Sequence, residues 1–229
     1  MINKQKDDAK KRIFDAAARL FAHKGFAAVS TREIAKEANV NSSMLFYYFG
    51  KKVDILKAII NECYDKYYQI IDNIGDEITP FQKRVRLVVR NLVEFFRTNT
   101  EVATVSFNTL PVDIPEIVDL KIKWISGRRK AMNKMFTQFG LDTNDRVQMG
   151  VMRGFLTSVI LTHFQNEYAW QHIKQAPDQS KYTQEFIKQE DDVELDNTFY
   201  ESYSETLANA YLHSLGSITA KNKKKEIPR

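Results

Sequence analysis

Apolar residues recur every three to four positions along almost the whole chain, and this spacing constrains the fold more than any other feature. Only 8 Gly and 5 Pro interrupt the 229 residues, which favours long packed helices over a turn-rich sheet. We therefore expect an all-α protein with a polar loop over residues 177–196. The predicted helices cover about residues 7–23, 30–38, 42–49, 53–75, 79–98, 101–110, 115–139, 142–170 and 198–215.

The second and third predicted helices are short and are joined by a turn from Asn39 to Asn41. Ser30 and Glu33 have the spacing of a capping box, in which each side chain accepts a hydrogen bond from the backbone of the other residue. Two short helices joined in this way predict a helix-turn-helix, whose second helix fits the major groove of DNA.

Positive charge is concentrated near the N-terminal end of the sequence. Residues 1–60 hold 12 Lys and Arg against 6 Asp and Glu, whereas the remainder holds 22 against 23. A basic segment on a near-neutral body indicates contact with a polyanion. The alternative is a solvated N-terminal helix without a partner, and charge alone leaves it open.

The third predicted helix has an outward face without a carboxylate that would repel phosphate. At about 100° per residue, Leu45 and Phe49 lie on one side and are expected in the core. Ser43 and Tyr47 fall on the opposite side, where they could hydrogen-bond a base edge or a phosphate. The aromatic residues beside this face, for which packing inside the head is the alternative, are Phe46 and Tyr48.

The segment from Ile13 to Ile59 resembles the DNA-binding head of TetR-family transcription regulators. An alanine-rich helix ends in a Lys-Gly-Phe turn, and Ser-Thr-Arg-Glu-Ile-Ala opens the next helix. A Leu-aromatic-aromatic-aromatic-Phe run followed by Lys completes the pattern. The resemblance covers about a fifth of the chain, and the rest matches only in length and helical character.

The resemblance implies a helix-turn-helix DNA-binding domain at residues 1–50 and a larger helical effector-binding and dimerisation domain at residues 51–229. It implies a ligand-responsive transcriptional regulator that binds a double-stranded DNA operator. The family's usual member is a repressor that a small-molecule effector releases from the operator. The alternatives are a helical carrier or enzyme with a vestigial head, and a structural nucleic-acid-associated protein without an effector.

Site residues follow from the same resemblance. Thr31 would contact a phosphate at the start of the second helix, and Arg32 would contact a base, most plausibly guanine. The residues that would face the groove are Ser42, Ser43, Met44 and Tyr47, and those that would hold phosphates are Tyr48 and Lys52. Two positions depart from the family: Phe46 replaces a usual Tyr, and Asn39 replaces a usual Gly but tolerates the left-handed conformation.

A single head makes few base contacts, so the resemblance implies a homodimer through the last two long helices. Each of these helices carries an apolar stripe: Val151, Phe155, Val159 and Thr162 on the first, and Leu207, Ala210, Tyr211, Ser214 and Leu215 on the second. Periodicity leaves open whether a partner or the core of the same chain covers these stripes.

The body is expected to enclose a pocket for the effector, with apolar walls and a few polar groups. The candidates, for each of which ordinary core packing is the alternative, are Tyr67, Phe107, Trp124, Arg128, Phe136, Phe155 and His163. The helix after the head carries Lys52 near its start and Tyr64, Tyr67 and Tyr68 near its end. A tilt of this helix would therefore couple effector binding to DNA binding.

Enzymatic, metal and membrane functions find little support in the sequence. It has no glycine-rich phosphate loop and no hydrolase or metalloprotease motif, so we expect neither an enzyme nor a cofactor. We interpret His163 and Glu167, four residues apart, as a pair that stabilises the helix or lies in the core, in preference to a metal site. We interpret Cys63 as a small core residue. No apolar stretch is long enough for a bilayer or a signal peptide, and we expect a cytoplasmic protein.

Overall fold

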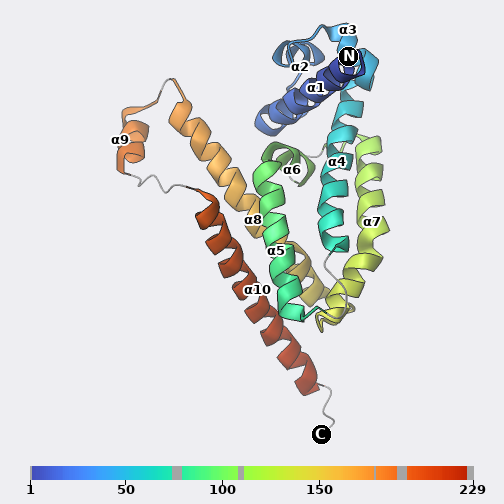
Figure 1. Cartoon of the computed structure of the whole chain (residues 1–229), viewed down its shortest axis with the longest axis vertical. Helices are drawn as coiled ribbons and strands as arrows, with labels where there is room; N and C mark the ends of the chain where they lie inside the picture. Colours follow the sequence, from blue (N-terminus) through green and yellow to red (C-terminus); the bar gives the residue numbers. More distant parts are fainter. Residues whose placement is uncertain (1, 74–78, 108–110, 178, 190–194, 226–229) are drawn as a thin grey trace. The chain divides into compact units, whose positions relative to one another are not determined.

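The computed structural model describes residues 2–73, 79–107, 111–177, 179–189 and 195–225. These ranges form ten helices and contain no strand (Figure 1), so the all-α expectation is confirmed. The helices are α1 (Ile2–Lys24), α2 (Thr31–Glu37), α3 (Ser42–Phe49), α4 (Lys52–Asp72), α5 (Phe81–Thr98), α6 (Thr100–Phe107), α7 (Pro115–Gln138), α8 (Arg146–Gln175), α9 (Lys181–Gln189) and α10 (Asn197–Lys225). No helix in the described ranges is long and apolar enough to cross a membrane.

The chain forms two compact units, and the first consists of residues 1–69 and 99–130. In this unit α1, α2 and α3 pack together around a small core (Figure 1). Ile13, Ile34 and Leu45 are completely buried there. Gly25 follows α1 with φ of +76°, a conformation that favours glycine, and its N–H bonds the carbonyl of Phe21 at 3.0 Å. These local features form a compact three-helix head.

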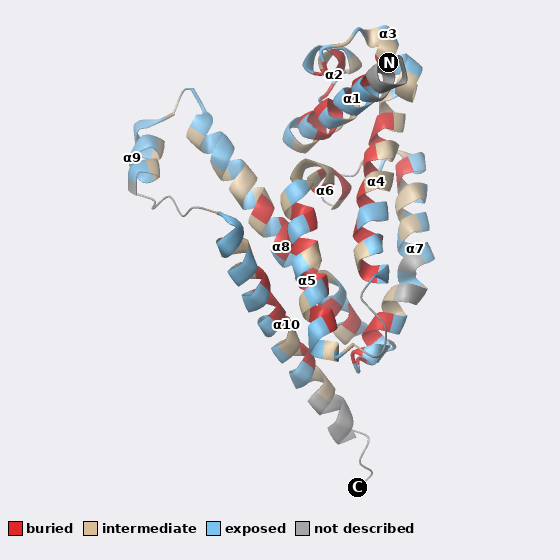
Figure 2. Ribbon diagram, in the orientation of Figure 1, coloured by how far each residue is buried: buried red, intermediate tan, exposed pale blue. Residues whose placement is uncertain are grey.

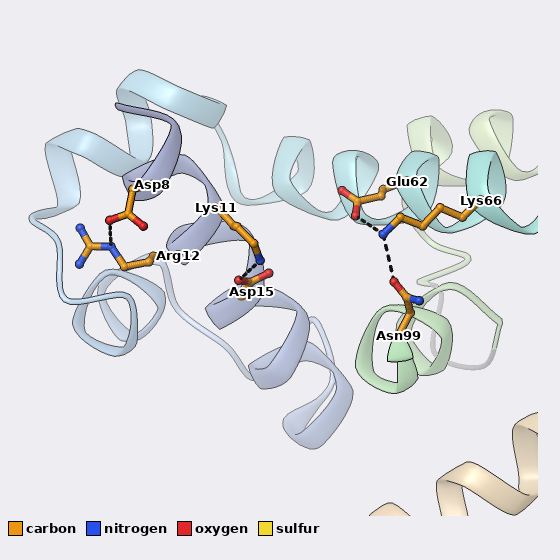
Figure 3. Close-up of polar contacts among 7 residues, drawn as sticks. All are labelled: Asp8, Lys11, Arg12, Asp15, Glu62, Lys66 and Asn99. Atoms are coloured by element: carbon orange, nitrogen blue, oxygen red, sulfur yellow. Dashed lines mark hydrogen bonds and ion pairs between the residues drawn. The ribbon is translucent and has the colours of Figure 1, made fainter. Parts of the chain in front are cut away.

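Two further helices, α4 and α6, extend the first unit beyond the head. α6 packs along α1, and it buries Ala103 and Val105. The Nζ of Lys66 on α4 donates to Glu62 at 2.8 Å and to Asn99, just before α6, at 3.0 Å (Figure 3). The buried apolar residues of α4 include Ile55, Leu56, Ile59, Ile60, Cys63, Tyr67 and Ile71. Burial raises the pKa of the Cys63 thiol to about 12, in keeping with a core residue.

The second unit consists of residues 70–98 and 131–229, and α5 packs in it against both α8 and α10. Figure 2 shows the buried stripes of these helices. The buried apolar residues are Val85, Val88, Val89, Leu92, Val93, Phe95 and Phe96 on α5, Met149, Met152, Leu156, Ile160, Leu161 and Phe164 on α8, and Leu207, Ala208, Tyr211 and Leu215 on α10. Helical periodicity thus accounts for the core of this unit.

Residues 177–196 are not the continuous polar loop that we expected, because residues 181–189 form α9. Tyr182 and Phe186 are four residues apart and give this short helix an apolar face. The ring of Phe186 packs against Trp170 of α8 with centroids 5.7 Å apart. The pair of Trp170 and Phe186 gives this segment a tertiary contact that its polar composition did not predict.

Several helix ends also differ from the expectation: α1 begins at Ile2, about five residues earlier, and α8 ends at Gln175, about five residues later. α8 begins at Arg146, not near Asp142, because the side chain of Asp145 caps it by accepting hydrogen bonds from Val147 and Gln148 at 2.9 and 3.0 Å. α10 continues through Gly216 to Lys225 instead of ending near Leu215. Gly216 has no positive φ, so it does not act as a helix stop here.

Candidate nucleic-acid interface

The capping box predicted at the start of α2 is present. The Oγ of Ser30 accepts from the backbone N–H of Glu33 at 3.2 Å, and Glu33 accepts from the backbone N–H of Ser30 at 3.5 Å. Lys24 donates to Glu33 at 2.5 Å, and this bond, with that from Ser30, lowers the pKa of the Glu33 carboxyl. The cap holds Thr31 and Arg32 in the first turn, where free N–H groups favour anions.

The turn between α2 and α3 keeps its shape without glycine. Asn39 has φ of +52°, which confirms that it adopts the left-handed conformation. Arg12 of α1 donates to the carbonyl of Asn39 at 3.4 Å. Asn41 caps α3 by accepting from the N–H of Met44 at 2.9 Å. We did not anticipate this cap, although an Asn before a short helix is a usual signal for one.

The third helix buries one side and exposes the other, as predicted. Leu45 is fully buried, whereas Tyr47 is 72% exposed and Ser43 is also exposed. Phe46 is 55% exposed, which excludes the alternative that it belongs to the core of the head. The half-buried residues at the margin of this face are Ser42, Met44 and Tyr48. The face carries aromatic and small polar groups and no carboxylate.

Two residues of this helix have intramolecular contacts that the sequence did not predict. The hydroxyl of Ser43 donates to the capping oxygen of Asn41 at 2.6 Å, so the same side chain that faces outward also steadies the cap. Phe49, expected in the core, is only half-buried. Lys10 lies 5.8 Å above its ring, and both residues line a hollow of about 350 Å³. The last turn of α3 is not packed deeply enough to bury this ring.

Lys52 and Lys51 stand side by side but have different surroundings. The Nζ of Lys52 donates to the carbonyl oxygens of Phe26 and Val29 at 2.8 and 2.7 Å, and it lies 4.3 Å above the ring of Phe26. Burial lowers the pKa of its ammonium. Lys51 is exposed, and within the described residues its ammonium makes no hydrogen bond or ion pair. Lys52 ties the loop between α1 and α2 to the start of α4.

Comparison with known proteins agrees with this geometry. Residues 13–59 match the family model of the bacterial regulatory proteins of the tetR family. This match to the tetR family covers about a fifth of the chain. The match runs from the middle of α1 into α4 and includes the capped start of α2 and the exposed face of α3.

Relatives of the chain are named as helix-turn-helix transcriptional regulators. YuxN of Bacillus subtilis is 34% identical over 91 residues, covering 38% of this chain and 31% of that protein. The repressor NicS of Pseudomonas putida is 23% identical over 101 residues, or 44% of this chain and 48% of that protein. The biofilm regulator IcaR of Staphylococcus aureus is 34% identical over 62 residues, or 27% and 33%. The matched part of the chain spans between about a third and about half of the length of these three relatives.

Solved structures extend the likeness to the whole fold. The fatty acid degradation regulator FadR from Bacillus halodurans is 16% identical with a TM-score of 0.61, covering 89% of this chain and 94% of that one. A TetR-like regulator from a Rhodococcus species is 15% identical with a TM-score of 0.60, covering 90% and 96%. Both likenesses concern the fold alone. They show that the body, like the head, has the architecture of the TetR family.

Three of the effector candidates lie together in the first unit. Phe107 of α6 packs against Tyr67 of α4, with ring centroids 5.4 Å apart. Trp124 of α7 stacks on Tyr64 and Tyr68 of α4 at 5.8 and 5.9 Å. Its Nε1 donates to Asn61 at 2.9 Å, a polar partner that we did not anticipate. We call these rings the aromatic cluster, with members Tyr64, Tyr67, Tyr68, Phe107 and Trp124.

The remaining effector candidates lie elsewhere. Phe136 is buried in the second unit, and Phe155 of α8 packs on Tyr211 of α10 at 5.6 Å. Arg128 lies in α7, but its side chain is outside the described residues. Phe136 and Phe155 thus belong to the second unit, whereas the aromatic cluster belongs to the first.

His163 of α8 is surrounded by aromatic rings. It stacks on Tyr203 and Phe199 of α10 at 4.7 and 5.9 Å. Its Nε2 is buried and finds no hydrogen-bond partner within the described residues. Burial lowers the pKa of this imidazole, while the nearby Glu167 acts in the opposite direction. Within the described ranges, no three His, Cys, Asp or Glu residues gather as a metal site.

Proposed function

We propose that this chain is a transcriptional regulator that binds operator DNA through α3 and the first turn of α2. The observation that carries the proposal is the exposed, carboxylate-free face of α3, where Tyr47 and Phe46 are 72% and 55% exposed. A helix of this size fits the major groove, and exposed aromatic and hydroxyl groups can contact base edges and methyl groups. Burying these rings against DNA would recover apolar area that the free protein leaves in water.

The proposed DNA contacts follow the family pattern. Thr31 would hold a phosphate, and Arg32 would donate to a base edge; its exposed guanidinium makes no hydrogen bond or ion pair within the described residues. The proposed groove residues are Ser42, Ser43, Met44 and Tyr47, and the proposed phosphate contacts are Tyr48 and Lys52. Lys52 already uses two of its three N–H donors within the head, so one remains for a phosphate.

The test is binding to DNA. We expect the protein to protect a site in the DNA that flanks its own gene, or a site selected from random duplexes, in a footprinting assay. A specific site should bind more tightly than bulk DNA by about 10³-fold or more. Failure to select or protect any sequence, with a folded protein, would contradict the proposal.

We propose residues 1–50 as the DNA-binding domain and residues 51–229 as the effector-binding and dimerisation domain. For the homodimer, an unpaired apolar stripe on α8 supports the proposal: Val147, Val151 and Val159 are 77%, 53% and 41% exposed. On α10, by contrast, Leu207, Tyr211 and Leu215 are buried within the chain. The α10 contribution would therefore come from other residues, such as the exposed Ala210.

An effector would act through the aromatic cluster. α4 joins the head directly to this cluster, since Lys52 lies at its start and Tyr67 near its end. α6 provides a second connection, because it packs along α1 and ends in Phe107. A ligand that separates these rings would shift α4 and α6 together, and effector and DNA would then weaken each other's binding by about 1–3 kcal/mol. The proposed role as a repressor rests on the names of the relatives NicS and IcaR.

A further inference from the structure

α5 and α10 pack against each other (Figure 1). Their contact has a polar edge, and near each end of this edge an arginine of α5 is bonded to α10. Arg86 of α5 pairs with Glu205 of α10 and donates to Asn209 at 2.7 Å. Arg97 of α5 donates to Asn197 at 2.9 Å and lies 5.2 Å from the ring centroid of Tyr200. We call this edge the α5–α10 seam, made of Arg86, Arg90, Glu94 and Arg97 on α5 and Asn197, Tyr200, Glu201, Ser204, Glu205 and Asn209 on α10.

The middle of the α5–α10 seam lacks this cross-link. Arg90 and Glu201 are both exposed, and within the described residues neither makes a hydrogen bond or an ion pair. Both line two adjoining hollows of about 270 and 390 Å³. Opposite charges thus border the same space without an ion pair, although Arg86 does pair with Glu205 nearby.

Ser204 also lines both hollows, and it is the buried member of the group. It is only 7% exposed, yet its hydroxyl makes no hydrogen bond within the described residues. Two other serines of α10, Ser214 and Ser217, donate to the carbonyls four residues back at 3.0 and 3.1 Å. The hydroxyl of Ser204 is therefore open to the hollow and can donate to or accept from a ligand there.

We propose that the middle of the α5–α10 seam binds a small zwitterion with a carboxylate and an ammonium group, such as an amino acid. The carboxylate pairs with the guanidinium of Arg90, which suits a planar two-oxygen acceptor. The ammonium pairs with Glu201, and the ligand accepts or donates a hydrogen bond at Ser204. A ligand of one charge would leave the opposite protein charge without a partner. The two hollows have room for a molecule of about ten non-hydrogen atoms.

This site is separate from both proposed sites of DNA and effector binding, and it does not depend on them. Successive residues of a helix are about 100° apart, so Glu201 and Ser204 lie on the side of α10 opposite Thr206 and Ala210. Ala210 belongs to the face offered above for the partner subunit. A zwitterion in the α5–α10 seam would therefore leave the proposed dimer face free.

The test is calorimetric titration of the full-length protein with glycine, β-alanine and 4-aminobutanoate, which differ in the separation of their charges. We expect saturable binding of at least one of them. Butanoate and butylamine, with one charge each, should bind about tenfold more weakly or not at all. Arg90→Gln and Glu201→Gln should each lower the affinity for the zwitterion by about tenfold, and Ser204→Ala should lower it by about threefold.

Lys83→Gln, which removes an exposed cation elsewhere on α5, is the matched control and should bind as the wild type does. Thermal melting of each variant checks that the fold is intact. The proposal is overturned if none of the three zwitterions binds saturably, or if the single-charge compounds bind equally well. Binding that Arg90→Gln and Glu201→Gln leave unchanged overturns it as well, because the ligand would then lie elsewhere.

Discussion

The ammonium of Lys52, at the start of α4, lies 2.7 Å from the carbonyl oxygen of Val29 in the loop before α2. A second bond to the carbonyl of Phe26 at 2.8 Å holds the same loop. The position of the capped start of α2 relative to α4 therefore depends on one side chain. Any movement of α4 would carry this loop, and with it Thr31 and Arg32, in the same direction.

Lys52→Met keeps the aliphatic packing on Phe26 and removes both hydrogen bonds. We expect a loss of about 2 kcal/mol in the free energy of unfolding and faster amide hydrogen exchange in residues 26–30. Lys51→Met is the control, because its exposed side chain leaves that loop untouched. It should leave stability unchanged. Equal exchange in the two variants would show that Lys52 does not hold the loop.

Ser30→Ala removes the cap of α2 and should lower the free energy of unfolding by about 1 kcal/mol. Ser43→Ala removes an exposed bond to the side chain of Asn41 but leaves the cap bond from Met44 to Asn41, so it should lower stability less than Ser30→Ala does. Chemical denaturation measures both effects. Operator affinity should show the opposite order: it should fall more in Ser43→Ala than in Ser30→Ala, because Ser43 is a proposed groove contact. A larger stability loss in Ser43→Ala than in Ser30→Ala would contradict this assignment.

Arg32→Ala should cost about 1–3 kcal/mol of operator affinity and relax the preference at one base pair in each half-site. Arg19→Ala serves as the comparison, because this arginine lies on the same head but pairs with Glu37 at 3.2 Å. Exposed pairs of this kind contribute little to stability. Binding to a set of operator variants measures both effects. If Arg32→Ala retained the wild-type base preference, Arg32 would not contact a base.

Val151→Glu places a charge in the exposed stripe of α8, where Val151 is 53% exposed. We expect sedimentation analysis to show the mass of one chain in place of two, because a buried unpaired carboxylate opposes association. Ile122→Glu changes a similarly exposed residue of α7, 58% exposed, and should leave the mass unchanged. If the Val151→Glu protein remained dimeric, the interface would not include this stripe.

Burial of His163 predicts an acid-sensitive stability. Its pKa in the folded chain is lowered from the ordinary value of 6.5, so the unfolded chain binds the proton more tightly. The stability that neutral His163 contributes is complete above about pH 6.5 and decreases as the pH falls toward the lowered folded value. The melting temperature of His163→Gln should therefore fall less between about pH 7.5 and 5.5 than that of the wild type. His213→Gln, at an exposed position of α10, should behave as the wild type does.

Local spacing predicted most of the head correctly, because its determinants act over a few residues. The pair Ser30 and Glu33 specified a cap that is present, and Asn39 adopts the left-handed conformation that its small polar side chain tolerates. Rotation about the axis of α3 separated the buried Leu45 from the exposed Tyr47. The prediction that Phe49 is buried was wrong, because the angle of a residue around a helix does not show how far the neighbouring elements extend.

Tertiary structure alone decided which surface covers each apolar stripe. Periodicity marked similar stripes on α8 and α10, but Leu207 and Tyr211 are buried within the chain while Val151 is exposed. The partners of Lys52 lie more than twenty residues before it, and Arg86 pairs with Glu205 across more than half the chain. A sequence pattern shows which side of a helix is apolar or charged. Only the packing of distant segments determines what that side meets.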